Sequence, residues 1–176
     1  MDLVERTLSS QEIFAGRIVR LRVDTVELPD GQHSTREVVE HAGAVAIVAL
    51  DSAGQLVMVR QYRQPVERIL VEIPAGTLEI GEDPLDCARR ELEEETGLTA
   101  AHWEKILTYY STPGFTNECL HIFMATGLTE GAAQPDHDEF VETVRVPLGE
   151  AYQQIFTGHI TDGKSIIGIQ YAYSQR

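Results

Sequence analysis

Apolar and polar residues alternate through the first part of the chain, which is the pattern of a strand with one covered face. In the segment RIVRLRVDTVEL, the apolar residues Val19, Leu21 and Val23 occupy every second position. A Pro-Asp-Gly sequence at 29–31 follows and favours a tight turn, because aspartate and glycine accept the backbone angles that turns require. We therefore predict that residues 12–41 form extended strands joined by this turn.

The segment AVAIVAL, residues 44–50, is apolar without interruption. A short continuous run of this kind is typical of a strand that is covered on both faces. Further strands are expected at 56–63, 70–76, 103–111, 118–127 and 140–148, with one strong helix at 84–96 and weaker helices at 149–156 and 165–173. This order predicts an α/β fold in which a mixed sheet packs between helices.

The strong helix has clear start and stop signals. Asp83 is a favourable N-cap, and Pro84 suits the first turn, where its missing N–H would have no partner. Gly97 can adopt the left-handed conformation that ends a helix. The apolar residues that share one side of this helix, and can pack against a sheet, are Leu85, Ala88 and Leu92.

Glu91, Glu94 and Glu95 lie at i, i+3 and i+4 on this helix, so their carboxylates gather on a face separate from the apolar one. Like charges at this spacing repel by roughly 0.2–0.5 kcal/mol per pair. A divalent cation such as Mg²⁺ prefers oxygen ligands and turns this repulsion into attraction. Glutamates alone usually form a solvated surface, as we expect for Glu93, so the surrounding residues decide between the two interpretations.

The surrounding residues match the pattern G-x5-E-x7-R-E-U-x-E-E-x-G-U, in which U is apolar. Every fixed position is filled, by Gly76, Glu82, Arg90, Glu91, Leu92, Glu94, Glu95, Gly97 and Leu98. The chain therefore resembles the Nudix hydrolases. The resemblance implies a Nudix-type α/β/α sandwich with a mixed sheet, preceded by an N-terminal antiparallel β-sheet extension.

The resemblance also implies roles for individual residues. The expected ligands of a divalent metal, Mg²⁺ or in its place Mn²⁺, are the carbonyl of Ala75 and the side chains of Glu91, Glu94 and Glu95. Glu82 and Arg90 are expected to form an ion pair that holds the loop against the helix, and Gly76 to permit the backbone geometry of the loop. Glu94, Arg90 and Glu82 are accordingly assigned to catalysis.

Further segments resemble the ADP-ribose pyrophosphatase branch of that family, namely HAGAVAIVAL, VRQYRQPVE, VEIPAG, YYSTPGFTNE and DEFVE. The branch implies hydrolysis of ADP-ribose to AMP and ribose 5-phosphate. Planar guanidinium groups suit diphosphate and ribose oxygens in an otherwise acidic chain. The substrate-binding residues that we expect are Arg36, Arg60, Arg63, Glu72, Gly114 and Phe115.

The general base is expected in the acidic segment QPDHDEFVE. Hydrolysis needs a water molecule that is activated by a metal, by a carboxylate or by both. The resemblance of DEFVE places Glu139 near the metal, and we expect Glu139 to be the base. Glu142, Asp138 and His137 remain candidates, and a histidine can transfer a proton near neutral pH.

Charge and composition exclude several classes of partner. The chain has 176 residues, a formal net charge of −14 and a pI near 4.7, and no basic run offers the counterion release that supports binding to nucleic acid. No apolar run approaches the roughly 20 residues that cross a bilayer, and the N-terminus lacks the pattern of a signal peptide. We expect a cytoplasmic protein that binds a small nucleoside diphosphate sugar, without nucleic acid or membrane.

We expect two parts, residues 1–41 as the β extension and residues 42–176 as the hydrolase domain. By the resemblance, the extension contacts a second subunit in a homodimer. Within the enzyme class, the alternative is hydrolysis of another nucleoside diphosphate sugar or of a dinucleotide. From a different class, the alternative is an ADP-ribose-binding sensor without turnover, which would not be obliged to keep the metal ligands. A purely acidic interaction module would require the complete motif to be a coincidence.

Overall fold

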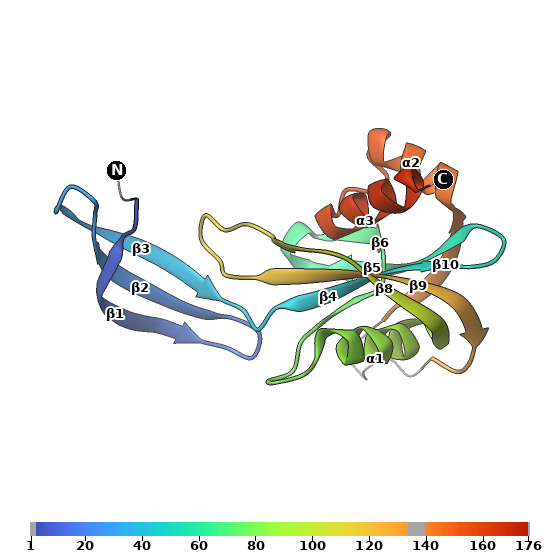
Figure 1. Ribbon diagram of the computed structural model, residues 1–176, viewed down its shortest axis with the longest axis horizontal. Coiled ribbons are helices and arrows are strands. Elements are labelled where there is room, and N and C mark those ends of the chain that lie inside the picture. Colours follow the sequence, from blue (N-terminus) through green and yellow to red (C-terminus); the bar gives the residue numbers. More distant parts are fainter. Residues whose placement is uncertain (1–2, 134–139, 176) are drawn as a thin grey trace. The chain divides into compact units, whose positions relative to one another are not determined.

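The computed structural model describes residues 3–133 and 140–175, and the chain forms two compact units (Figure 1). The first unit comprises the chain up to Gly43 together with Tyr110–Cys119. The second comprises Ala44–Tyr109 and the chain from Leu120 onward. Each unit has its own β-sheet, so each is described by itself.

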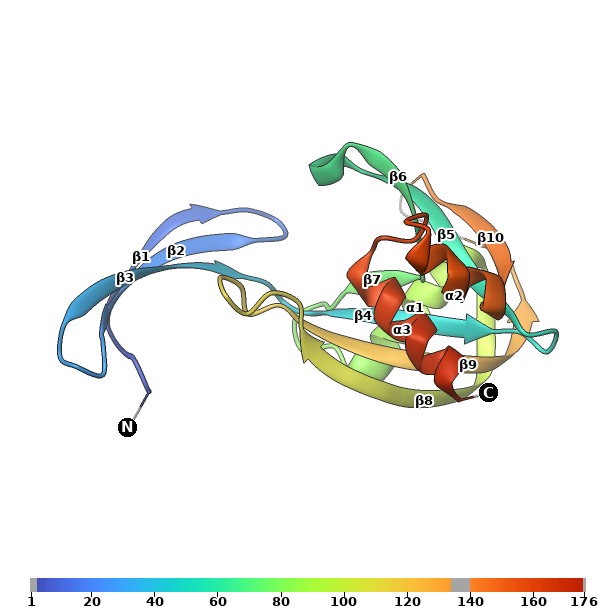
Figure 2. The ribbon, with the colours of Figure 1, turned by 90° about the horizontal axis from the view of Figure 1, so that it is seen from above.

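The first unit is a three-stranded antiparallel sheet in the order β1-β2-β3 (Figure 2). Its strands are β1 (Arg6–Ala15), β2 (Arg20–Glu27) and β3 (His33–Glu40). The predicted turn is confirmed: Gly31 has a φ of +82°, and its N–H donates to the Leu28 carbonyl at 2.9 Å. Strand β1 begins at Arg6, before the predicted region. The sequence did not indicate this start, because every residue of the strand is exposed and no apolar alternation marks it.

The segment Tyr110–Cys119 is attached to the end of β3 by backbone contacts. The Val39 N–H donates to the Phe115 carbonyl at 2.8 Å, and the Asn117 N–H donates to the Val39 carbonyl at 3.3 Å. The Asn117 side chain also accepts from the His41 N–H at 2.8 Å. These contacts explain why a segment distant in sequence belongs to the first unit.

The second unit is built on a mixed sheet with the order β10-β5-β4-β9-β8, with β6 paired to β5 and β7 paired to β4. Strands β4 and β9 are parallel, while the other recorded pairs are antiparallel. Its strands are β4 (Ala44–Leu50), β5 (Gln55–Arg63), β6 (Arg68–Glu72), β7 (Ala75–Thr77), β8 (Leu98–Tyr110), β9 (Cys119–Glu130) and β10 (Glu142–Pro147). Its helices are α1 (Pro84–Thr96), α2 (Leu148–Phe156) and α3 (Gly163–Ser174), with a 3-10 turn η1 (Gln64–Val66) after β5.

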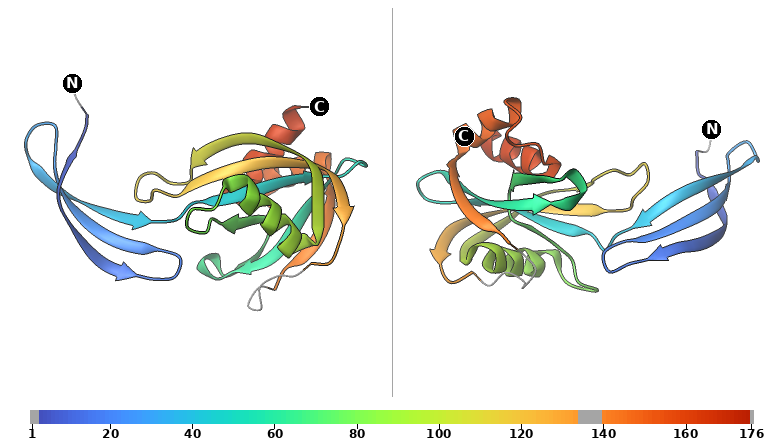
Figure 3. Two further views of the ribbon diagram at one scale, coloured as in Figure 1. Left: turned by 60° about the horizontal axis from the view of Figure 1, so that its bottom comes forward. Right: turned by 180° about the vertical axis from the view of Figure 1, so that it is seen from behind.

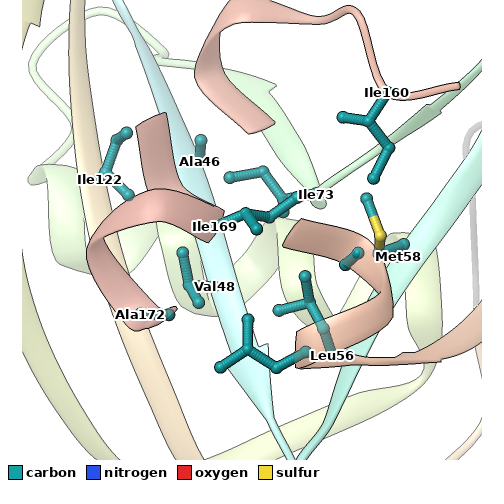
Figure 4. Close-up of a cluster of buried hydrophobic side chains, with 11 residues drawn as sticks. Ala46, Val48, Leu56, Met58, Ile73, Ile122, Ile160, Ile169 and Ala172 are labelled. Carbon is teal, nitrogen blue, oxygen red and sulfur yellow. The ribbon is translucent and has the colours of Figure 1, made fainter. Parts of the chain in front are cut away.

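Helices cover both faces of this sheet: α1 lies on one face, and α2 and α3 lie on the other (Figures 1 and 3). The continuous apolar run of β4 follows from this arrangement, because alternate side chains enter different layers. Val45 and Ile47 pack in the layer with Ala88 and Leu92 of α1. The layer beneath α2 and α3 consists of Ala46, Val48, Leu56, Met58, Ile73, Ile122, Leu148, Ala151, Ile160, Ile169 and Ala172 (Figure 4).

The predicted α/β/α sandwich with a mixed sheet and an antiparallel N-terminal sheet is confirmed. The helix predicted at 84–96 has those bounds. Helix α3 begins at Gly163, slightly before the predicted start, because Asp162 caps it by accepting from the Ser165 N–H. None of the helices in the described part of the chain combines the length and apolar character needed to cross a membrane.

Candidate functional site

Helix α1 is fixed in position at both ends. The Asp83 carboxylate accepts from the Leu85 N–H at 2.9 Å, which satisfies one of the free donors of the first turn. Gly97 ends the helix with a φ of +70°, and a Cβ atom at this position would lie 2.6 Å from the Ala133 backbone nitrogen. Gly97 is therefore needed both for its conformation and for the close approach of the following chain.

Glu82 and Arg90 form the ion pair expected between the loop and the helix. The Arg90 Nε donates to one carboxylate oxygen of Glu82 at 3.0 Å, and Nη2 donates to the other at 3.1 Å. The Glu79 N–H also donates to Glu82, at 2.9 Å, so the carboxylate connects the loop backbone to the helix. The hydrogen bonds from Arg90, above all, lower the pKa of Glu82 to about 2, which keeps this carboxylate charged at neutral pH.

Arg90 also joins two of the predicted metal ligands. Its Nη1 donates to a Glu91 oxygen at 2.8 Å and to a Glu94 oxygen at 2.9 Å. Both carboxylates are thus within reach of a single cationic atom. The predicted convergence of side chains at i and i+3 is present for Glu91 and Glu94, with the guanidinium group as the shared cation.

Gly76 lies directly against the Glu91 carboxylate. A Cβ atom built at Gly76 would overlap the carboxyl carbon and both oxygens of Glu91. Any other residue at position 76 would therefore displace a predicted metal ligand. Glycine is required at this position because there is no space for a side chain. Its backbone angle is not the reason, since the φ of Gly76 is not positive.

Glu95 differs from the other two carboxylates because it is buried, with 5% of its surface exposed. One of its oxygens accepts from the Ala75 N–H at 3.0 Å. This bond ties the end of α1 to strand β7, and it places the Ala75 backbone beside the Glu95 carboxylate. Ala75 and Glu95, two of the predicted metal ligands, are thereby brought together.

The donor chemistry of this cluster fits a hard divalent cation, which takes carboxylate and carbonyl oxygens. Glu91 and Glu94 already share one cationic nitrogen. Within residues 3–133 and 140–175, however, no three acidic, histidine or cysteine side chains surround a common point that could hold a metal ion. The carboxylates are arranged around Arg90 and the Ala75 N–H instead.

Arg63 of β5 is held by Glu72 of β6. The Arg63 Nε and Nη2 donate to the two carboxylate oxygens of Glu72 at 3.0 and 2.9 Å, a bidentate geometry. The Glu72 side chain is 1% exposed, whereas that of Arg63 is 39% exposed. Burial opposes ionisation of Glu72, but Arg63 and the charge of Lys164 outweigh it and hold the pKa of Glu72 below its usual range. Arg63 thus presents a fixed guanidinium group at the surface.

Three residues at the start of α3 complete this network, and the sequence analysis missed all three. Lys164 Nζ bonds to Glu72 and lies 3.0 Å from an Asp162 oxygen. The Ser165 hydroxyl donates to Asp162 at 2.6 Å and accepts from the Ile73 N–H at 2.9 Å. The Asp-x-x-Ser spacing is an N-cap signal that could have marked the start of α3, but no signal in the sequence connects Lys164 to Glu72.

Arg60 is not brought together with Arg63. The two are three positions apart on β5, so their side chains leave opposite faces of the sheet. Met58, on the face of Arg60, packs under α2 and α3, whereas Val57, on the face of Arg63, packs against α1. Arg60 instead bonds to Glu142 at 2.6 Å, so the structure places this predicted substrate ligand and this candidate base on the face away from α1.

Arg36, Gly114 and Phe115 belong to the first unit. Arg36 donates to Glu5 at 2.9 Å, and Phe115 is 54% exposed in the loop that follows β8. The remaining candidates for the base fall outside the described residues; they are Glu139, Asp138 and His137.

Comparison with known families finds two matches along this chain. A model described as the NUDIX domain matches residues 40–166. A second, described as the nucleoside diphosphate sugar hydrolase N-terminal domain, matches residues 5–39.

Several characterised proteins are similar over almost the whole chain. A methanol dehydrogenase activator of Bacillus methanolicus is 49% identical over 97% of this chain and 94% of its own length. An ADP-ribose pyrophosphatase of Bacillus subtilis is 46% identical over 97% of this chain and 93% of its own length. An ADP-ribose pyrophosphatase of Mycobacterium tuberculosis is 43% identical over 93% of this chain and 80% of its own length. A crystal structure of an ADP compounds hydrolase superimposes with a TM-score of 0.87 over 99% and 96% of the two chains at 20% identity, which is a likeness of fold.

Proposed function

This chain belongs to the NUDIX family of hydrolases, and from that premise we propose that it cleaves the pyrophosphate of ADP-ribose to give AMP and ribose 5-phosphate. The observation that carries the reaction class is the acidic face of α1, where Glu91 touches Gly76 and shares a cationic partner with Glu94. The choice of ADP-ribose is supported by the relatives of 46% and 43% identity that are named ADP-ribose pyrophosphatase.

Nudix hydrolases require a divalent metal, and we propose Mg²⁺, with Mn²⁺ as a substitute. The residues proposed to hold it are the Ala75 carbonyl, Glu91, Glu94 and Glu95. When bound, the metal would neutralise charge on the diphosphate and favour ionisation of a water molecule.

Two ion pairs of the second unit are proposed to position these ligands and the substrate. Glu82 and Arg90 hold the loop against α1 through two hydrogen bonds. Arg63, oriented by Glu72, is proposed to donate to the phosphate or ribose oxygens of the substrate. Glu139 is the proposed general base, and Glu142 is a poorer candidate because its carboxylate is bonded to Arg60 on the other face.

The chain is proposed to form a homodimer through its first unit. Its strand β1 exposes Leu8, Ile13 and Phe14 by 41–57%, apolar area that a second copy could cover. Arg36, Gly114 and Phe115 remain proposed substrate contacts, whereas Arg60 is a poorer candidate because it lies with Glu142 on the face away from α1. A cytoplasmic location is part of the same proposal.

The test is product analysis with purified protein and Mg²⁺. We expect ADP-ribose to yield AMP and ribose 5-phosphate, and to be preferred over GDP-mannose and FAD as competing nucleotides. Preference for either competitor would reassign the substrate within the family. Tight binding of ADP-ribose with no AMP formed would instead support the sensor, and chelation of the metal should abolish product formation if the proposal is right.

A second candidate function follows from the relative of 49% identity, whose name describes activation of a methanol dehydrogenase. The two functions can be separated by experiment, because activation requires a second enzyme and pyrophosphate hydrolysis does not. Adding this chain to a methanol dehydrogenase should raise its rate if activation applies. A Glu95→Gln variant in the same assay would show whether the effect depends on the acidic helix.

A further inference from the structure

The start of helix α3 is connected to the predicted substrate arginine through buried charge. Lys164 Nζ bonds to the same Glu72 oxygen that accepts from Arg63 Nη2. The Glu72 side chain is 1% exposed and that of Lys164 is 12% exposed, so both groups are largely removed from water. A charge-assisted contact of this kind is strong and costly to break.

We propose that Lys164 is a positioning residue that orients Arg63 for substrate binding by fixing the Glu72 carboxylate between two cations. The inference rests on the proposed function, because it assumes that Arg63 contacts the substrate. It goes further by assigning a role to a residue of the C-terminal helix, which lies outside the motif that carries the metal ligands.

The bidentate contact couples the orientation of Arg63 to that of Glu72. Arg63 donates to both oxygens of Glu72 with Nε and Nη2, so the orientation of the carboxylate sets the orientation of the guanidinium group. Among the hydrogen bonds of the described residues, Arg63 uses Nε and Nη2 and none involves its Nη1, which we assign to the substrate. The charge of Glu95 adds to the effect of Glu72 in raising the pKa of Arg63, which agrees with Arg63 lying near the acidic helix.

Helix α3 has an attachment to the sheet besides Lys164. The Ser165 hydroxyl already accepts from the Ile73 N–H and donates to Asp162, and Asp162 caps the helix. A lysine in the first turn of a helix is also electrostatically unfavourable, because the helix dipole is positive there. Its bond to Glu72 therefore points to a role in the network around Arg63 rather than in the helix itself.

The experiment compares Lys164→Met and Lys164→Arg with the wild-type chain. The matched control is Lys105→Met, which removes the only other lysine, an exposed residue of β8. Dissociation constants for ADP-ribose are measured by calorimetry in metal-chelated buffer, where the substrate is not turned over, and KM and kcat are measured with Mg²⁺. Thermal unfolding and circular dichroism check the fold, and Lys164→Gln replaces Lys164→Met if that variant does not fold.

We expect Lys164→Met to weaken ADP-ribose binding about tenfold, the scale of one weakened charge-assisted contact. KM should rise in parallel while kcat changes less than about threefold, the pattern of lost ground-state binding. Lys164→Arg should recover most of the affinity because it keeps the charge, and Lys105→Met should match the wild type. In an Arg63→Ala background, Lys164→Met should add less than about twofold, because the two residues act through one network.

This inference alone would be overturned if the wild-type chain binds and cleaves ADP-ribose and Lys164→Met is equal to it, or if the loss of affinity in Lys164→Met persists in full without Arg63. A loss of thermal stability with unchanged affinity would likewise reduce Lys164 to a structural residue. A wild-type chain that neither binds nor cleaves any nucleoside diphosphate sugar would overturn the proposed function, and this inference with it.

Discussion

The two units of the molecule differ in how much apolar surface they bury. The second unit has a buried apolar layer on each face of its sheet. In the first unit, Val26 is the one apolar side chain that is buried among the residues that the structure describes. Strand β1 is exposed along its whole length, with Ile13 51% and Phe14 57% exposed.

This difference indicates which unit can be stable by itself. Burying one large apolar side chain contributes about 1.5–3 kcal/mol, and ordering each residue costs about 1–2 kcal/mol in backbone entropy. A three-stranded sheet that buries one apolar side chain has little to offset that entropy. The second unit can therefore hold the acidic helix and Arg63 in place internally, whereas we propose that the first is stabilised by contact with a second copy of the chain.

The largest effect is expected from opening a cavity in the second unit. Leu92 of α1 is fully buried in the layer between this helix and the sheet, so Leu92→Ala should reduce the free energy of unfolding by about 2–5 kcal/mol. The matched control is Ile80→Ala, at a fully exposed position in the loop before α1, where a change within about 0.5 kcal/mol is expected. Urea unfolding followed by circular dichroism measures both. Equal losses would mean that the layer under α1 is not a true core.

The next effect concerns activity without loss of fold. Glu95→Gln removes the charge of a buried carboxylate that also accepts from Ala75, and we expect kcat to fall about 100-fold or more, as when one charge-stabilising group is lost. The amide oxygen can still accept from Ala75, so the melting temperature should change little. The control is Glu93→Gln, an exposed residue on the same helix. Equal activity of the two variants would contradict the assignment of metal ligands.

Local signals explain which parts of this fold the sequence could predict. Helix α1 was predictable because Asp83, Pro84 and Gly97 act within one or two residues of its ends. The continuous run of β4 predicted a strand with both faces covered, and its alternate residues do enter different layers. Strand β1 was not predictable from periodicity, since all its residues are exposed and no face is selected to be apolar.

The contacts of the candidate site also divide into those that local patterns predict and those that depend on the packing of distant elements. The family resemblance implied the pair of Glu82, in the loop, with Arg90, and helical spacing predicted that Glu91 lies beside Glu94, because residues at i and i+3 share a face. The contact between Lys164 and Glu72 joins residues 92 positions apart, and only the packing of α3 brings them together. The separation of Arg60 from Arg63, by contrast, could have been predicted, because positions i and i+3 of the strand expected at 56–63 lie on opposite faces.

A smaller effect concerns the association of two copies of the chain, which we expect to involve the first unit and not the second. If a second copy covers β1, Ile13→Asp places a charge in an apolar interface and should raise the dimer dissociation constant about tenfold or more. Sedimentation at several protein concentrations measures the constant. Ala53→Asp adds the same charge in an exposed turn of the second unit and should leave assembly unchanged. A wild-type chain that is monomeric at all concentrations would remove the explanation for the exposed apolar residues of β1.

The smallest effect concerns ion pairs, which also differ between the units. Arg90 holds the pKa of Glu82 at about 2 in the folded chain, against an ordinary value of 4.5, so the folded state favours the charged carboxylate. The resulting stabilisation is complete above about pH 4.5 and is lost as the pH falls toward 2. Glu82→Gln should therefore lower the free energy of unfolding, measured by urea titration at pH 7, by about 1 kcal/mol after allowance for solvent screening, and by progressively less toward pH 2.5. In the first unit, the pair of Arg20 and Glu12 has side chains 60% and 52% exposed, and Glu12→Gln should change stability by only a few tenths of a kcal/mol at pH 7. If Glu82→Gln lowered stability equally at every pH, its carboxylate charge would not be what ties the loop to α1.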